Sequence, residues 1–320
     1  MSANLRGVDT HGVLRLKGYI DRIKNGGNNP APDIKIIKDE KMYAVMDGDN
    51  SLGQVGGYAA MTAAIKKANE YGIGIVSMRN SNHYGVAGYY AMMPLQYDMI
   101  GISMTNVLAC MAPSGGTKPK LGNNPVSLAF PAYEKPPVVL DFATSKSSWG
   151  KALTSKQQKE PLPEDCFMDS DGNPTMDPDK FLSGGTLLPI AGYKGYGLAL
   201  IISMFCCLLS GGKFDMELPH LYNKLNEPGE NSFLMVAIKI ENFTAALDFK
   251  KRLDNIITLI KDTPLIEGVD RIYLPGEKEY EEEQKRLKFG VPLSISLITD
   301  LLKIAEEAKV NISQYNFLKI

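Results

Sequence analysis

Residues 73–85 of this chain read Ile-Gly-Ile-Val-Ser-Met-Arg-Asn-Ser-Asn-His-Tyr-Gly. The apolar, β-branched stretch Ile73 to Met78 predicts a buried strand, and the polar residues that follow predict a loop at its end. His83 in this loop is a candidate general acid or base, because imidazole titrates near neutral pH and loops on a rigid sheet carry functional groups. Gly85 would let a ligand or another backbone approach closely. The alternative is a loop histidine hydrogen-bonded to a neighbour.

Further strands and helices extend the pattern in both directions along the chain. Strands are predicted at 42–47, 100–105, 126–130, 138–142 and 233–240, and helices at 13–23, 60–71, 197–209, 245–260 and 297–308. The turn-rich residues 151–189 predict an excursion over the surface, and the charged run 277–288 predicts a solvated helix face. No G-x-G-x-x-G hexapeptide occurs, which disfavours a Rossmann fold.

Composition narrows the class of protein. The chain has 320 residues, 44% of them apolar, and 35 Lys and Arg against 36 Asp and Glu, so neither disorder nor attraction to nucleic acid or an anionic membrane is expected. At about 150 residues per domain the length suggests two domains.

The longest apolar run, 198–209, is shorter than the roughly 20 residues that span a bilayer and predicts a buried helix. Four cysteines without a C-x-x-C pair predict no metal site, and no secretory signal precedes the first charges, so we expect a cytoplasmic protein.

A second cluster of polar side chains lies near the start of the chain. His11, Arg15 and Tyr19 are spaced i, i+4 and i+8, which places them on one helix face. An Arg side chain binds a carboxylate through two parallel hydrogen bonds, so this face could hold a small acid. The alternative is a solvated face with Arg15 in an ordinary salt bridge.

Two further segments could bind an anion or a ribose. Residues 192–197 place glycines and Lys194 at a helix N-terminus, where free N–H groups favour a phosphate; a glycine-rich entry loop with an exposed lysine is the alternative. Asp141 to Ser145 ends a predicted strand with several hydrogen-bonding groups, although helix capping by Thr144 or Ser145 explains them equally well. His220 has no polar cluster near it and is interpreted as a surface or satisfied histidine.

Seven segments in this order resemble the malate/L-lactate dehydrogenase family, whose members include ureidoglycolate and sulfolactate dehydrogenases and use NAD(P) without a Rossmann fold. The segments are residues 5–13, 47–54, 80–85, 121–125, 139–145, 192–197 and 275–277. The resemblance covers nearly the whole chain. It implies an α+β fold with a largely antiparallel or mixed sheet in the cofactor domain.

The resemblance also implies residue roles. His83 matches the catalytic acid/base of the family and Arg15 the group that holds the substrate carboxylate, while His11 and Tyr19 match the adjoining substrate pocket. Contacts to the cofactor are implied for Asn106, Asn124, Asp141, Ala143, Thr144, Lys194, Pro275, Gly276 and Glu277. A homodimer is implied, with residues 1–70 and 285–320 as a helical substrate and dimerisation domain around an NAD(P)-binding domain at 71–284.

The expected reaction is hydride transfer between NAD or NADP and a small 2-hydroxy acid, with malate and oxaloacetate as the preferred pair. A reductase for the C=N bond of a cyclic imino acid and a catalytically inactive binding relative remain as alternatives. The sequence departs from the family at Val107, where a small hydroxyl residue is common, so one cofactor hydrogen bond is in doubt. Family members also carry a helical segment ahead of the motif at 5–13. Either the sequence omits this segment or the protein lacks it. Without it, the outer wall of the substrate pocket and the dimer contact would be affected.

Overall fold

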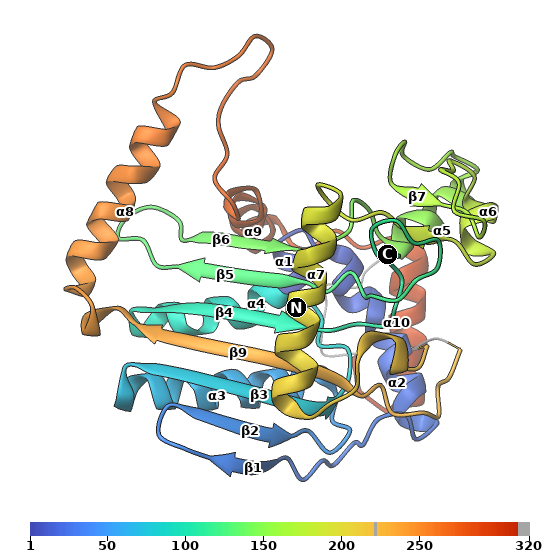
Figure 1. Cartoon of the computed structure of the whole chain (residues 1–320), viewed down its shortest axis with the longest axis horizontal. Coiled ribbons are helices and arrows are strands. Elements are labelled where there is room, and N and C mark those ends of the chain that lie inside the picture. The colour runs from blue at the N-terminus through green and yellow to red at the C-terminus, as the bar shows by residue number, and fades with distance from the viewer. Residues whose placement is uncertain (221–222, 313–320) are drawn as a thin grey trace.

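The fold is built around one seven-stranded sheet, as a computed structural model shows for residues 1–220 and 223–312 (Figure 1). Its spatial order is β1-β2-β3-β9-β4-β5-β6. The strands are β1 Lys35–Asp39, β2 Tyr43–Asp47, β3 Ile73–Ser81, β4 Met99–Thr105, β5 Val126–Phe130, β6 Val138–Phe142 and β9 Asn231–Lys239. Pairing of β2 with β3 is parallel and the other pairings are antiparallel, which confirms the predicted mixed sheet. Strand β1, whose residues are all exposed, was not predicted, because it shows no alternation of apolar and polar residues.

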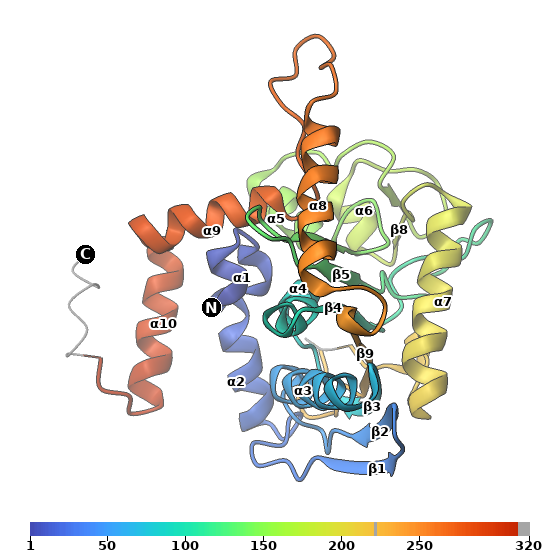
Figure 2. The same cartoon turned by 90° about the vertical axis from the view of Figure 1, so that its left-hand side faces the viewer.

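Helices cover both faces of this sheet. They are α1 Ser2–Leu5, α2 Leu16–Lys24, α3 Gly53–Tyr71, α4 Ala87–Met92, α5 Trp149–Gln158, α6 Pro178–Leu182, α7 Tyr193–Ser210, α8 Ala246–Lys261, α9 Glu277–Phe289 and α10 Ile295–Glu307. Figure 2 shows α3 and α4 on one face and α7 on the opposite face. Helix α3 ends at Gly72, whose left-handed backbone (φ 90°) suits glycine.

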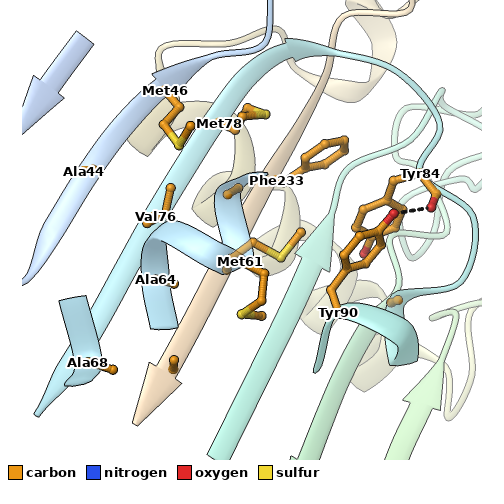
Figure 3. Packing of buried hydrophobic residues seen from close by; sticks show 14 of the residues in the cluster. Ala44, Met46, Met61, Ala64, Ala68, Val76, Met78, Tyr84, Tyr90 and Phe233 are labelled. Atoms are coloured by element: carbon orange, nitrogen blue, oxygen red, sulfur yellow. Dashed lines mark hydrogen bonds between the residues drawn. The ribbon is translucent and has the colours of Figure 1, made fainter. Parts of the chain in front are cut away.

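The main core lies between α3 and the central strands. Met61 and Ala64 of α3 pack against Val76 and Met78 of β3 and against Phe233 of β9, all fully buried (Figure 3). Tyr84 stacks on Phe233 with ring centroids 4.8 Å apart, and the hydroxyl of Tyr90 donates to the Tyr84 carbonyl at 2.6 Å. The residue that follows His83 is therefore fixed in the core, which anchors the loop at the end of β3.

Residues 151–189, predicted as a surface excursion, carry regular elements and buried side chains. They contain most of α5, all of α6 and the short strands β7 Phe167–Met168 and β8 Thr186–Leu187, and with Met111, Leu121 and Ala199 they form a second core. Leu162, Phe167, Phe181 and Leu187 are each at most 1% exposed. These apolar residues are too far apart in sequence to give a periodic signal, so only the folded chain brings them together.

The predicted buried helix is α7, and burial is confined to one of its faces. Ile202 and Cys206 pack on the sheet, and Ala199 packs in the core that contains Leu187. The opposite face exposes Phe205 and Leu208 at 44% and 68%. Among the described residues α7 is the one helix whose length and composition would suit a membrane span, and its sheet-facing residues explain part of that apolar character.

The two ends of the described chain pack together beside the sheet (Figure 2). Arg286 of α9 is 9% exposed and binds Asp9 at 2.7 Å, and Arg6 binds Glu283 of the same helix at 2.9 Å. The charged run 277–288 is therefore solvated on one face only. The main sheet begins inside the segment 1–70, because β1 and β2 are two of its strands and α3 packs against it. The division into two domains stays a prediction.

Candidate active site

His83 lies immediately beyond β3, in the loop that leads to α4. The first residue of α3, Gly53, abuts this loop so closely that a Cβ atom there would lie 2.1 Å from the Asn82 carbonyl oxygen. Gly85 has φ +85°, and nothing lies within 3.8 Å of a Cβ built there, so its left-handed backbone rather than a close approach requires glycine. The backbone on both sides of His83 is thus fixed by the sheet and by α3.

The cluster His11, Arg15 and Tyr19 is not on one continuous helix. The chain forms two short 3₁₀ turns, Asp9–His11 and Val13–Arg15, with an extended residue, Gly12, between them before α2 begins. The Asn4 side chain accepts a hydrogen bond from Val13 N at 2.8 Å across this break. The single helix face that the i, i+4, i+8 spacing predicted is therefore wrong.

These residues nevertheless converge on His83. The Tyr19 hydroxyl lies 2.7 Å from His83 Nδ1, and the His11 and His83 rings stack with centroids 5.6 Å apart. Arg15 donates from Nε to the Thr10 carbonyl at 2.7 Å. One pocket is lined by Arg15, Gly18, Tyr19, Arg22, Asn28, Asn82 and His83, and none of these side chains is acidic.

The ionisation of this cluster follows from its burial. Burial lowers the pKa of His83 to about 3, and the nearby His11 and Arg15 act in the same direction. Burial and Arg15 lower the pKa of His11 to about 4, and burial raises the pKa of Tyr19 to about 12. At neutral pH both imidazoles are uncharged and the phenol keeps its proton, so Arg15 and Arg22 supply the positive charge of the pocket wall.

Tyr19 contacts one of the two ring nitrogens of His83. Because Nδ1 faces the phenol, Nε2 is left for a reacting group, and within the described residues it forms no hydrogen bond. The phenol either donates to Nδ1, which leaves the proton on Nε2, or accepts from Nδ1–H, which leaves the Nε2 lone pair free. The pair can thus present an acid or a base at the same place.

Arg22 and Asn82 support this pocket and were missed by the sequence analysis. Arg22, 4% exposed, donates to Asn28 at 3.0 Å, to Asn82 at 3.2 Å and to the Glu227 carbonyl at 2.7 Å. It belongs to the same helix as Tyr19, and Asn82 precedes His83. Arg22 lies three residues after Tyr19, a spacing that could have drawn attention to it, but carbonyl partners 205 residues away leave no trace in sequence.

Two of the residues implied for the cofactor, Asn106 and Asn124, are fully buried and use their amides inside the protein. Asn106 donates to the Lys213 carbonyl and accepts from Ser232 N, both at 2.8 Å. Asn124 donates to the Ala199 carbonyl at 3.0 Å and accepts from Val107 N at 2.9 Å. These side chains hold loops in place and have no polar atom left for a ligand.

A second group of implied residues meets at the N-terminal end of α7. Thr144 N donates to the Asn123 carbonyl at 3.2 Å, and Ile190 N donates to the Thr144 carbonyl at 2.9 Å. The Thr144 hydroxyl is buried and has no hydrogen-bond partner in the described part of the chain. Ala143 is half-buried and Lys194 is exposed on the first turn of α7. Segments 122–124, 143–145 and 190–195 thus form one junction, which is called the α7 junction below.

The remaining implied residues, Asp141 and the turn Pro275 to Glu277, lie along β6. Asp141 accepts a hydrogen bond from Gly88 N at 2.7 Å, at the start of α4. The Pro275 carbonyl accepts from Val139 N at 3.0 Å, and Gly276 has φ +81°, with no room for a Cβ against Val139. Glu277 pairs with Lys261 and accepts from Leu274 N, so this acid already has partners.

Among the described residues no group of three or more His, Cys, Asp or Glu side chains could hold a metal. The neutral His83 with Tyr19 and a guanidinium in one pocket is suited to proton transfer on a bound small acid. Residues 1–302 match the family described as malate/L-lactate dehydrogenase. The chain belongs to this family.

Individual relatives agree with that membership. The chain is 42% identical to the malate dehydrogenase of Pyrococcus abyssi over 96% of its own length and 86% of the relative's. Its fold superposes on the sulfolactate dehydrogenase of Methanocaldococcus jannaschii with a TM-score of 0.90 at 41% identity, and on the malate dehydrogenase of Entamoeba histolytica with 0.92 at 35% identity. Each superposition covers 98% of this chain and 90% of the other.

The prediction from the motifs is thereby confirmed at the level of family, fold and reaction class: the chain is a nicotinamide-dependent 2-hydroxy acid dehydrogenase. The imino-acid reductase and inactive-relative alternatives are not favoured, because relatives at 41–42% identity are malate and sulfolactate dehydrogenases.

Proposed function

We propose that the pocket around His83 interconverts malate and oxaloacetate, with Arg15 holding the carboxylate next to the reacting carbon and with His11 and Tyr19 lining the substrate pocket. The observation that carries this proposal is the 2.7 Å contact between Tyr19 and His83 Nδ1 in a pocket that Arg15 also lines. A planar guanidinium binds a carboxylate through two hydrogen bonds and fixes its orientation.

In this proposal His83 is the acid/base. In the oxidation direction Nδ1–H donates to Tyr19 and Nε2 accepts the hydroxyl proton of the acid. In the reduction direction Nε2 returns a proton to the oxo group. A carboxylate on Arg15 neutralises a charge that lowers the pKa of His83, so substrate binding itself moves that pKa towards the range needed for catalysis.

NAD or NADP is the proposed hydride acceptor, and when bound it exchanges a hydride with the carbon that bears the hydroxyl. Support for its fit comes from the α7 junction, where the buried Thr144 hydroxyl has no partner among residues 1–220 and 223–312 and Lys194 lies at the N-terminus of an 18-residue helix. Asp141, Ala143 and the turn Pro275 to Glu277 are proposed as further contacts. Asn106 and Asn124 are proposed to act through the loops that they hold.

The experiment is a substrate panel followed at 340 nm with NADH and, in parallel, with NADPH. Oxaloacetate should be reduced with a higher kcat/KM than pyruvate, sulfopyruvate and a cyclic imino acid. Faster turnover of pyruvate or of the imine would contradict the assignment to malate. The ratio between the two cofactors decides which one the enzyme prefers.

We also propose a homodimer in the cytoplasm that uses the outer face of α7, which lies outside the segments 1–70 and 285–320 that the resemblance implies for dimerisation. This face exposes Ile201, Phe205, Leu208 and Leu209, each at 44–68%, in a family whose catalytic sites the resemblance places near a subunit interface. Light scattering should give twice the 35.1 kDa chain mass, and Phe205→Glu with Leu208→Glu should give the monomer. A wild-type monomer, or a dimer that survives both changes, would contradict this interface.

A further inference from the structure

Asp215 is a fully buried carboxylate that no sequence motif indicated. It begins the short 3₁₀ turn Asp215–Glu217 that follows α7. Burying a charged carboxylate costs free energy unless hydrogen-bond donors surround it, so the donors to Asp215 show which segments it connects. Burial raises its pKa, and the surrounding donors act in the opposite direction.

The partners of Asp215 come from two separate parts of the chain. Ser203 in the middle of α7 donates to Oδ1 at 2.6 Å. Gly122 N and the Asn124 side chain both donate to Oδ2 at 2.8 Å. One carboxylate therefore ties the loop 122–124 to the helix whose first turn carries Lys194.

The network extends one step further on each side. Asn124 also accepts a hydrogen bond from Val107 N and donates to the Ala199 carbonyl of α7. Gly122 has no room for a side chain, because a Cβ there would lie 2.3 Å from the Val107 carbonyl oxygen and 2.4 Å from the Asn124 amide oxygen. Asn123 lies between Gly122 and Asn124. Its carbonyl accepts a hydrogen bond from Thr144 N, and its side-chain amide donates to the Ser145 hydroxyl. Asp215 therefore supports the α7 junction through hydrogen bonds to buried groups on both sides.

We infer that Asp215 is a positioning residue for the cofactor: it sets the spacing between loop 122–124 and α7, and so the shape of the α7 junction. The inference rests on the proposed cofactor position and adds a residue that touches neither cofactor nor substrate. Asp215 does not line the pocket at His83. Its loss should therefore weaken cofactor binding and leave binding of the acid nearly unchanged.

Asp215→Asn tests the inference with the least change in shape. In one orientation the NH₂ group meets Gly122 N and the Asn124 amide, so a donor meets a donor. In the flipped orientation the NH₂ group donates to the Ser203 hydroxyl, and the two hydrogen bonds from loop 122–124 lose the negative charge that strengthens them. In fluorescence titrations of NADH and NADPH the Kd should rise about tenfold or more, as expected when about 1.4 kcal/mol of binding free energy is lost. The KM for oxaloacetate at saturating cofactor should stay within about twofold, and amide exchange at Gly122 and Val107 should accelerate.

The matched control is Asp171→Asn, which makes the same chemical change in an exposed turn and should leave both Kd values unchanged. Ser203→Ala removes the hydrogen bond from Ser203 to Asp215 and is the variant to use if Asp215→Asn does not fold; its Kd for the cofactor should rise about threefold to tenfold. A folded Asp215→Asn or Ser203→Ala protein with wild-type Kd overturns the inference. If the wild-type protein binds neither NADH nor NADPH, the proposed function fails instead, so the two failures are distinguishable.

Discussion

The pocket at His83 and the α7 junction differ in how their polar groups are used. In the pocket, His83 Nε2 forms no hydrogen bond with any residue that the structure describes, and burial beside Arg15 keeps the imidazoles neutral. Beneath the junction, Asn106, Asn124 and Asp215 are fully buried and are hydrogen-bonded to each other, to Ser203 or to backbone groups. The pocket is arranged to react, whereas the buried network below the junction is arranged to hold shape. Substitutions in the two regions should therefore fail in different ways.

The largest expected effect is on chemistry in the pocket. His83→Ala should lower kcat by about two to four orders of magnitude, because a positioned acid/base is lost. The free energy of unfolding and the Kd for NADH should change little. Steady-state kinetics and a cofactor titration on the same preparation check this, and near-normal turnover would remove His83 from the proposed role.

Asn124→Ala probes the opposite region. It leaves Val107 N without its partner and removes one of the two donors to Asp215 Oδ2, so the free energy of unfolding should fall by about 1 to 3 kcal/mol. Urea unfolding measures this loss. If stability is unchanged while kcat collapses, Asn124 reacts rather than supports, and the contrast between the regions is wrong.

Arg15→Ala sharpens the division within the pocket. Loss of a charge-assisted contact should raise the KM for oxaloacetate by about tenfold to a hundredfold, with a smaller change in kcat. Arg15→Lys should recover only part of the loss, because an ammonium cannot bind a carboxylate bidentately. An unchanged KM in the alanine variant would exclude Arg15 from carboxylate binding.

Tyr19→Phe should give a smaller loss, about tenfold in kcat, because one hydrogen bond to His83 Nδ1 disappears while the ring remains. The pH profile of kcat distinguishes an electronic from a structural effect: without the phenol the apparent pKa of His83 should move, whereas a packing defect would lower kcat equally at every pH.

The smallest expected effect is on stability against pH. His83 and His11 have folded pKa values near 3 and 4, below the unfolded value of 6.5. The unfolded chain therefore binds more protons below pH 6.5, and the free energy of unfolding falls as the pH drops from 6.5 towards 4, by up to about 1.4 kcal/mol per pH unit for each histidine. In thermal melts His11→Gln should show a shallower loss than wild type, and an identical slope would contradict the neutral buried state of His11.

Several local features followed from the sequence. The strand at 73–78 with His83 beyond it and the helix that ends at residue 71 were predicted from residues close together in the chain. The small core of Phe167 and Phe181 was not, because its members share no period.

What the sequence by itself determined is a mixed α+β fold without a dinucleotide fingerprint, the identity of His11, Arg15, Tyr19 and His83 as a set, and membership of a hydroxy acid dehydrogenase family. Only the tertiary structure decided that Tyr19 faces Nδ1 of His83, that α7 is buried on one side, and that Asp215 ties loop 122–124 to α7 across 91 residues of sequence. The reason is physical. Periodicity and caps depend on neighbours along the chain, whereas the partners of a buried charge are set by packing between distant segments.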